Sequence, residues 1–241
     1  MHECKMEEDA QAYEEMSKPQ IETGSRFIGK LGIFQGSNVL DMGCGTGCLT
    51  KYIADTVGAD GQVVGVDPDA ARIKIAKEKY RGLCNLQFYV GSSLSGFPGD
   101  SLPYYDFFIS TAVFHWVPHD EKEIFLRKAH QCLKPGGRLA MTCIVKIPNV
   151  VNDIFASYSL TEECYRKLFH DVGLFTNVVM EKNFHTLRCE SLGRFKQWYK
   201  ASAHQDLDSM NPCDIKEHLK EEGDGSVVCV VPRICITAIK P

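Results

Sequence analysis

The sequence predicts an open α/β fold, in which helices cover both faces of a mostly parallel sheet. Two observations support this fold class. Short apolar runs alternate with helical patterns of about a dozen residues, and glycine or proline bounds many of the runs. This alternation is typical of βαβ units, whose right-handed crossovers place helices on both faces of one sheet. A chain of 241 residues is long enough for one domain of this kind.

The first part of the chain is expected to supply five strands and three helices. The expected strands are short apolar runs, which fit buried parallel strands, over 37–42, 61–67, 85–90, 104–114 and 138–147. The expected helices have helical apolar spacing and cover 48–57, 69–80 and 120–133. Asp69 is the expected N-cap of the second helix, because its side chain can accept hydrogen bonds from the first turn.

The alternation changes after Pro148. A helix is expected within 160–175, from the cap signal at Thr161 to Gly173. The remaining expected elements are a strand over 176–187, helices near 191–203 and 214–222, and a final strand over 226–240. The two late strands predict a hairpin added at one edge of the sheet. Because no repeat or convincing boundary interrupts the chain, residues 1–241 are expected to form a single domain.

Composition and charge indicate which kinds of partner and compartment the sequence favours. The net charge of −4 does not favour a nucleic-acid partner. No apolar run approaches the roughly 20 residues that cross a membrane. The acidic N-terminal stretch does not fit a secretory signal, which predicts a cytoplasmic protein. The 11 cysteines form no Cys-x-x-Cys pair, so buried thiols are expected rather than a metal centre, with a metal or metalloid role for a subset as the alternative.

The stretch "VLDMGCGTG", residues 39–47, places a glycine-rich turn between an expected strand and helix. Such a turn lets the backbone approach a ligand closely, and the helix N-terminus first suggests a dinucleotide phosphate. The dinucleotide fingerprint, however, needs a glycine where Cys48 stands, and no Walker lysine follows. Asp41, two residues before Gly43, would repel a pyrophosphate and would suit an ammonium group.

Asp67 ends the next expected strand, in "VVGVDPD". About 20 residues after the glycine turn, a carboxylate can accept both hydroxyls of a ribose. These features fit a nucleoside that carries an amino-acid tail, namely S-adenosylmethionine. Asp41 would bind the ammonium group, the glycine turn would let the backbone approach the ligand, and Asp67 would bind the ribose. A plain tight turn and a helix cap remain the structural alternatives.

At these motifs the chain resembles the class I S-adenosylmethionine-dependent methyltransferases, over about 35–146. The resemblance rests on "VLDMGCGTG", "VVGVDPD" and "FHWV…CLKPGGRL" in order. It implies a Rossmann-like seven-stranded sheet with an antiparallel last strand, an N-terminal helical cap (1–34), a cofactor-binding core (35–147) and a C-terminal part with a short lid (148–241). It implies S-adenosylmethionine as the cofactor, held by Tyr13, Asp41, Gly43, Cys44, Gly45, Gly47, Asp67, Pro68, Ser92, Ser93, Leu94 and Thr111. Ser92 stands where family members usually carry an acid, and a neutral acceptor there binds adenine less strongly.

The acceptor of the methyl group is expected at "TAVFHWVPHD", after the fourth strand, where open α/β sheets bind ligands. His115 and Trp116 are the candidates there, since an indole N–H can donate to a carboxylate. Core packing is the alternative for Trp116, and a hydrogen-bonded structural histidine is the alternative for His115.

Within the family the chain is most similar to the carboxyl methyltransferases typified by juvenile hormone acid methyltransferase. "FHWV" and "YEEMSKPQ", with Tyr13 seven residues before Gln20, carry this resemblance. It implies that Gln20 and Trp116 hold a substrate carboxylate. The family inserts a long helical lid after the fifth strand, whereas this chain has only "PNVVNDIFASYS", which predicts a more open acceptor site.

The predicted function is therefore methylation of a small-molecule carboxylate by a monomer or homodimer that uses no metal, no nucleic acid and no membrane. Other acceptors, namely a phenol, an amine or an arsenic thiolate, are the first alternative. A non-catalytic protein that binds S-adenosylmethionine is the second, and a nicotinamide oxidoreductase fits least because of Asp41 and the glycine spacing.

Overall fold

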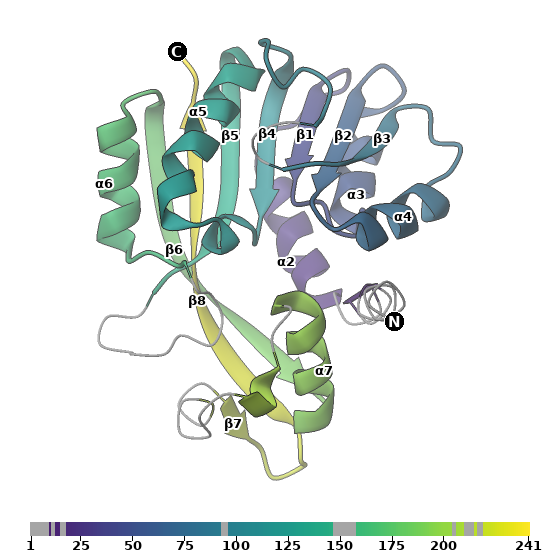
Figure 1. The fold of residues 1–241 in the computed structure, drawn as a ribbon, viewed down its shortest axis with the longest axis vertical. Coiled ribbons are helices and arrows are strands. Elements are labelled where there is room, and N and C mark those ends of the chain that lie inside the picture. The colour runs from purple at the N-terminus through teal and green to yellow at the C-terminus, as the bar shows by residue number, and fades with distance from the viewer. Residues whose placement is uncertain are drawn as a thin grey trace.

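The described residues form one eight-stranded sheet in the computed structural model of the protein (Figure 1). The structure describes residues 10, 13–14, 18–92, 96–146, 158–203, 206–209, 215 and 219–241. The strands lie in the order β3-β2-β1-β4-β5-β8-β6, and β7 pairs with β8 outside this path. Their bounds are β1 (Asn38–Met42), β2 (Gln62–Asp67), β3 (Leu86–Val90), β4 (Tyr105–Thr111), β5 (Leu133–Ile144), β6 (Thr176–Cys189), β7 (Leu219–Glu221) and β8 (Val227–Ile239).

The first five strands are parallel, and β8 is antiparallel to both β5 and β6. The predicted mostly parallel sheet with an antiparallel last strand is therefore confirmed. The late hairpin also forms, because β6 and β8 pair along their whole length. It joins the sheet through β8, so the last strand of the chain lies between β5 and β6.

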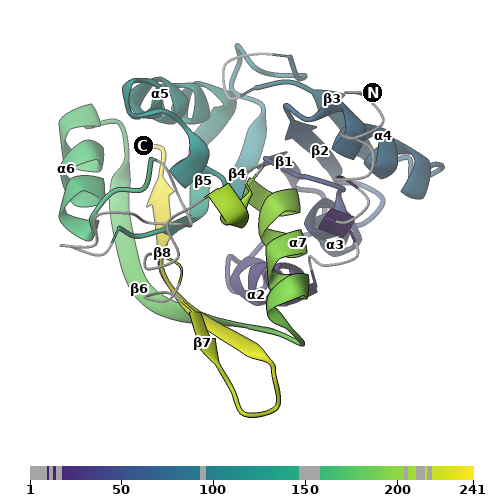
Figure 2. The same ribbon diagram turned by 60° about the horizontal axis from the view of Figure 1, so that its bottom comes forward.

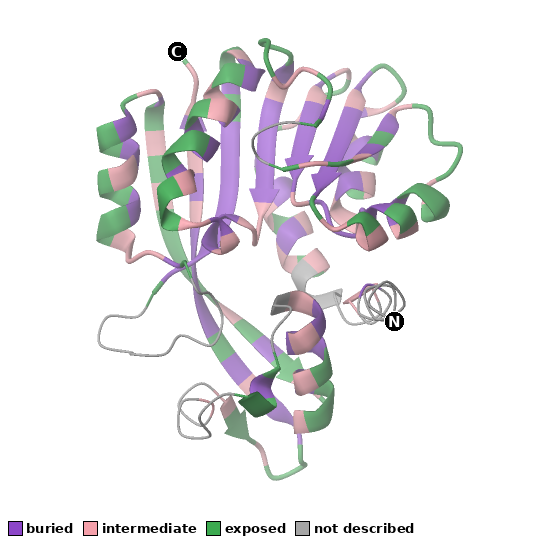
Figure 3. Ribbon diagram, viewed as in Figure 1, coloured by how far each residue is buried: buried purple, intermediate pink, exposed green. Residues whose placement is uncertain are grey.

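Helices cover both faces of the sheet, as predicted. They are α2 (Lys18–Ile28), α3 (Cys48–Val57), α4 (Ala70–Lys79), α5 (Lys122–Cys132), α6 (Glu162–Val172) and α7 (Leu192–Ala203), with short 3-10 helices η1 (Phe114–Trp116), η2 (His119–Glu121) and η3 (Leu207–Ser209). Figure 3 shows buried strands between helices whose outer faces are exposed.

Two apolar clusters, one on each face, hold the layers together. Alternate side chains of a strand point to opposite faces, so Val39 packs in the cluster under α2, α3 and α4, and Leu40 in the cluster under α5 and α6. Ile53 of α3 belongs to the first cluster, and Phe125 of α5 and Phe169 of α6 belong to the second. The central strands β1, β2 and β4 are thus buried on both faces.

The strands β6 and β8 are 14 and 13 residues long, whereas β1 has five. Their far halves continue past the carboxyl edge of the parallel strands, where α7 lies against them (Figures 1 and 2). A third apolar cluster holds this C-terminal lobe together: Ile144, Leu187, Phe195, Trp198, Tyr199, Leu207, Cys229 and Val231.

The predicted helix over 214–222 is wrong at its end, because Leu219–Glu221 forms β7 and pairs with Val227–Cys229 of β8. The long β8 offers backbone donors and acceptors beyond the main sheet, and pairing with them outweighs a weak helical preference. Among the helices of the described ranges, none combines the length and the apolar character that a membrane span needs.

Candidate functional site

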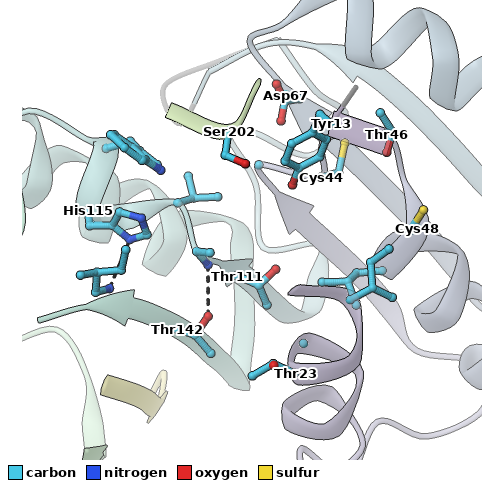
Figure 4. A pocket seen from close by; sticks show the side chains of 18 of the residues that line it. Tyr13, Thr23, Cys44, Thr46, Cys48, Asp67, Thr111, His115, Thr142 and Ser202 are labelled. Carbon is cyan, nitrogen blue, oxygen red and sulfur yellow. Dashed lines mark hydrogen bonds between the residues drawn. The ribbon is translucent and has the colours of Figure 1, made fainter. Parts of the chain in front are cut away.

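A cavity of about 300 Å³ lies at the carboxyl edge of the parallel strands, facing the C-terminal lobe (Figure 4). Its walls come from the turn after β1, the ends of β2, β4 and β5, helix α2, and α7 with β6 and β8 of the lobe. The core and the lobe therefore share one site. Its size falls at the small end of the range typical for ligand pockets.

The glycine-rich turn forms part of the cavity wall, and its backbone adopts conformations that favour glycine. Gly43 has a φ of 82°, and a Cβ added there would lie 2.1 Å from Val113 Cγ2. Gly47 has a φ of 84°, and a Cβ there would lie 2.6 Å from Phe88 Cζ. Only glycine avoids both the strain and the overlap. Gly43 and Cys44 line the cavity, whereas the lining does not include Gly45 or Gly47.

Asp67 lines the cavity at the end of β2. Its Oδ2 accepts a hydrogen bond from the Gly45 N–H at 2.9 Å, and its Oδ1 accepts one from the Asp69 N–H at 2.9 Å. Each carboxylate oxygen keeps a further lone pair, so Asp67 can still accept hydroxyl groups. Asp69 caps α4 as predicted, by accepting from the N–H groups of Ala71 and Arg72. Asp67 is thus not the helix cap.

Asp41 lies behind the wall rather than in it. It is buried, its Oδ2 accepts from Thr50 Oγ1 at 2.8 Å, and it is absent from the cavity lining. Burial raises the pKa of its carboxyl group to about 7. The direct contact expected between Asp41 and a cationic tail therefore finds no support in the geometry. Cys44 does line the cavity, and burial raises the pKa of its thiol well above the usual value, so it is no reactive thiolate.

Tyr13 lies over the glycine turn (Figure 4). A Cβ on Gly45 would sit 3.2 Å from Tyr13 Cε1, and the Arg72 guanidinium carbon lies 4.4 Å from the centre of the tyrosine ring. The family resemblance predicts that Tyr13 contacts the cofactor, and the structure brings Tyr13 and Asp67 into the same cavity wall.

The other cofactor candidates fall into three groups. Pro68 and Thr111 line the cavity. Ser92 is exposed and does not line it. Ser93 and Leu94 lie outside the described residues, as do the side chain of Gln20 and most of the short lid segment.

His115 and Trp116 reach the other end of the cavity because β4 stops at Thr111. Ala112 has a φ of 57°, and its N–H donates to Thr142 O at 2.9 Å and to Thr142 Oγ1 at 3.1 Å. This bend ends the strand earlier than the predicted 114 and sets up η1, which carries both rings into the cavity.

His115 is buried and neutral. Its Nδ1 accepts from the Ile144 N–H at 3.3 Å, so the proton is on Nε2. Burial, followed by the charges of Arg233 and Lys122, holds the pKa of His115 well below its usual value. His115 can therefore donate a hydrogen bond into the cavity, but it is a poor base there.

Sequence reasoning missed two groups of residues around His115 and Trp116. Lys122 is buried, and its Nζ donates to Phe114 O at 2.6 Å and to Val117 O at 2.8 Å, which holds the η1 turn. Side chains of the lobe complete the wall, among them Trp198, Ser202 and Arg233. The arginine inside the apolar stretch "VVPRICITAI" was the signal that could have indicated a buried site.

The described lobe changes the interpretation of the short lid. Residues 147–157 lie outside the described part of the chain, so the structure does not describe that segment. On the side that the structure does describe, α7 and the far halves of β6 and β8 form the cavity wall. The C-terminal lobe covers this side of the cavity, and the openness expected on the side of the short lid stays a prediction.

Comparison with known proteins identifies the family. Residues 39–137 match the model of the methyltransferase domain family. A demethylmenaquinone methyltransferase of Lactobacillus johnsonii is 30% identical over 207 residues, which cover 84% of this chain and 74% of that protein. The chain belongs to the class I S-adenosylmethionine-dependent methyltransferases. A phosphoethanolamine N-methyltransferase of Arabidopsis thaliana is 28% identical over 170 residues, and this methyltransferase chain matches only 33% of its length.

Solved structures share the fold of this methyltransferase. The YcgJ protein of Bacillus has a TM-score of 0.64 at 16% identity, with 91% of this chain and 98% of that chain covered. Phosphoethanolamine N-methyltransferase 2 of Haemonchus contortus, solved with phosphomonomethylethanolamine and S-adenosylhomocysteine, has a TM-score of 0.62 at 19% identity, with coverage of 91% and 52%. At these identities the likeness concerns the fold.

The cofactor of the family, S-adenosylmethionine, fits the residues that are present. Gly43 and Cys44 of the glycine turn bring backbone to the cavity wall, and Asp67 offers acceptor capacity beside them. The described residues contain no group of three or more His, Cys, Asp or Glu side chains placed to hold a metal ion.

Proposed function

We propose that this protein transfers the methyl group of S-adenosylmethionine to the carboxylate of a small molecule. The observation that carries the proposal is the state of His115, which presents an N–H rather than a base at the acceptor end. A carboxylic acid is already ionised at neutral pH and needs no base. A phenol or a protonated amine would have to lose a proton first.

Bound S-adenosylmethionine supplies an electrophilic methyl group for an in-line displacement. The protein's part is then alignment and exclusion of water. Asp67 and the backbone of Gly43 would hold the nucleoside, while the N–H groups of His115 and Trp116 would orient the acceptor. The apolar side chains of the lobe would keep water out of the space between them.

The resemblance to carboxyl methyltransferases typified by juvenile hormone acid methyltransferase supports this acceptor class through "FHWV" and Gln20. The relatives named above act on other acceptors according to their names, phosphoethanolamine and demethylmenaquinone. Nitrogen or carbon methylation is accordingly the competing function.

The test uses tritiated S-adenosylmethionine with a panel of fatty, isoprenoid and aromatic acids, phosphoethanolamine and a quinol. We expect label in methyl esters, which mild base releases as methanol. Label that survives base, or that enters only the amine or the quinol, would show that the acceptor is not a carboxylate.

A second measurement separates chemistry from folding. Trp116→Phe removes the indole N–H but keeps an aromatic ring, so we expect slower turnover with unchanged affinity for S-adenosylhomocysteine. An equal loss of turnover and cofactor affinity would assign Trp116 a structural role only.

A further inference from the structure

We propose that Arg233 binds a negatively charged group of the acceptor, so that the cavity selects amphipathic anions. Arg233 lies on β8 opposite Ile144 of β5, at the point where the core meets the lobe. Its side chain lines the cavity, and the residue is only 6% exposed. This inference deepens the proposed function and rests on it for the identity of the site.

The Arg233 side chain has no partner among the described residues. Its buried Nε lacks a hydrogen-bond acceptor, and no described carboxylate forms an ion pair with it. The two histidines that it affects electrostatically, His115 and His185, have lowered pKa values and are neutral at pH 7. A buried charge without a counter-charge is costly, so a ligand that supplies the anion would be bound favourably.

The charge of Arg233 persists at neutral pH. Burial lowers the pKa of its guanidinium group to about 10, which still leaves the group protonated. The planar fork of a guanidinium matches the oxygens of a carboxylate or a phosphate and can bind them with two hydrogen bonds. Lysine at this position would supply the charge without that geometry.

The surroundings of Arg233 indicate the rest of the ligand. Ile144, which lies opposite Arg233, lines the cavity and packs in one apolar cluster with three further lining residues, Leu187, Trp198 and Val231. The carboxylates Asp67 and Asp69 line the opposite, cofactor end. A molecule with one anionic group and an apolar or aromatic body complements the acceptor end.

The chain carries its own reporter for binding. It has two tryptophans, Trp116 and Trp198, and both line the cavity. Intrinsic fluorescence of the full chain, saturated with S-adenosylhomocysteine, can therefore follow titration with octanoate, octyl phosphate or octanol. None of these titrations depends on turnover.

We expect an octyl anion to bind at least about tenfold more tightly than octanol, which corresponds to one charge-assisted hydrogen bond. Octanoate and octyl phosphate distinguish the two kinds of anion. In Arg233→Met the advantage of the anion over octanol should disappear, and Arg233→Lys should retain part of it. Arg194→Met, which removes an exposed arginine of the same lobe, is the matched control and should bind like the unaltered protein.

Equal binding of anion and alcohol by the unaltered protein, or no binding of either anion, would overturn the inference. So would an Arg233→Met variant that keeps full anion preference. Calorimetry with S-adenosylhomocysteine checks that each variant is folded, and Arg233→Lys carries the test if Arg233→Met is not. Anion binding without methyl-ester formation would instead contradict the proposed function and leave the role of Arg233 intact.

Discussion

Asp67 connects the cofactor end of the cavity to the backbone around it. Its two oxygens hold the N–H groups of Gly45 and Asp69 and still have lone pairs free for a ligand. The carboxylate therefore shapes the turn and keeps the capacity to accept hydrogen bonds from a ligand. Its burial raises its pKa, opposed mainly by the positive charge of Arg72.

Replacement of Asp67 should weaken cofactor binding. In Asp67→Ala we expect a loss of about 1–3 kcal/mol, the usual cost of a lost charge-assisted hydrogen bond. Calorimetry with S-adenosylhomocysteine measures it. Asp55→Ala, which removes an exposed carboxylate paired with Lys51, should bind normally. Unchanged affinity in Asp67→Ala would remove Asp67 from the site.

The buried, neutral His115 should make the fold sensitive to acid. Its pKa in the folded state lies below the usual 6.5, so the unfolded chain binds more protons below that pH. Stability from this residue therefore falls as the pH drops below about 6.5, by up to about 1.4 kcal/mol per pH unit.

Urea unfolding between pH 7 and 5 tests this dependence. His115→Gln should show a shallower decrease of the unfolding free energy with falling pH than the unaltered protein. His170→Gln, at a ring that is 90% exposed, should not change the slope. Parallel slopes in all three proteins would show that His115 does not carry the effect.

At this scale the sequence predicted which residues come together where their motifs are local. Gly43, Asp67 and Tyr13 belong to contiguous motifs, and the structure brings them together in one wall. Asp41 shows the limit, because it is buried and bonded to Thr50 behind the wall, which the motif alone does not indicate. Arg233 shows it again, since an arginine inside an apolar stretch indicates a buried site, whereas its place at the cavity depends on the pairing of β8 with β5.

Among the elements, η1 is held in place by a lysine of α5. Lys122, at the start of α5, donates to the carbonyl groups of Phe114 and Val117, and its ammonium lies 4.5 Å from the Phe114 ring. Burial lowers the pKa of Lys122 to about 8, and the two carbonyl groups stabilise its charged form. The turn that carries His115 and Trp116 is thereby fixed to the core.

Lys122→Met should release this turn. We expect a loss of unfolding free energy of about 1–3 kcal/mol, because two carbonyl groups lose a charged donor. Turnover should also fall, with cofactor affinity nearly unchanged. Thermal unfolding and calorimetry measure the two effects, and Lys128→Met, which removes one bond to Asp100 O from the same helix, is the control. An unaltered kcat would mean that η1 keeps its position without Lys122.

Most elements were predicted close to their observed bounds, including the two long late strands, which were expected over 176–187 and 226–240 and are observed as β6 and β8. The expected bounds of α3, 48–57, agree with the structure, because its apolar spacing and its contacts lie close in sequence. The prediction of a helix at β7 was wrong because the contacts that decide its structure lie outside the segment. Whether 219–221 forms a strand depends on the free edge of β8, which the sequence of that segment does not contain.

At the scale of the whole molecule, the lobe has a core of its own. Phe195, Trp198 and Tyr199 of α7 pack in a cluster separate from the two clusters of the sheet. A hydrogen bond of 3.0 Å between Thr23 Oγ1 and His185 Nδ1 joins α2 to β6. Because its apolar cluster is separate from those of the sheet, we expect that the lobe can loosen while the sheet stays folded.

Phe195→Ala should loosen the lobe selectively. Removal of a buried phenylalanine costs about 3–5 kcal/mol, and we expect faster amide hydrogen exchange in α7 and the far half of β8. Exchange in β1 and β4 should be unchanged, and KM for the acceptor should rise more than KM for the cofactor. Uniformly faster exchange across the sheet would show that lobe and sheet unfold as one unit.

The position of β8 has a consequence for the order of folding. β5 pairs with a strand that begins only at residue 227, after the whole of α6, β6 and α7. Until β8 arrives, one edge of the apolar β5 remains unpaired and open to other chains. Such long-range pairing slows folding and lengthens the time for which an aggregation-prone edge is exposed. The strand that brings Arg233 to the cavity thus also covers the edge of β5 and removes this site of aggregation.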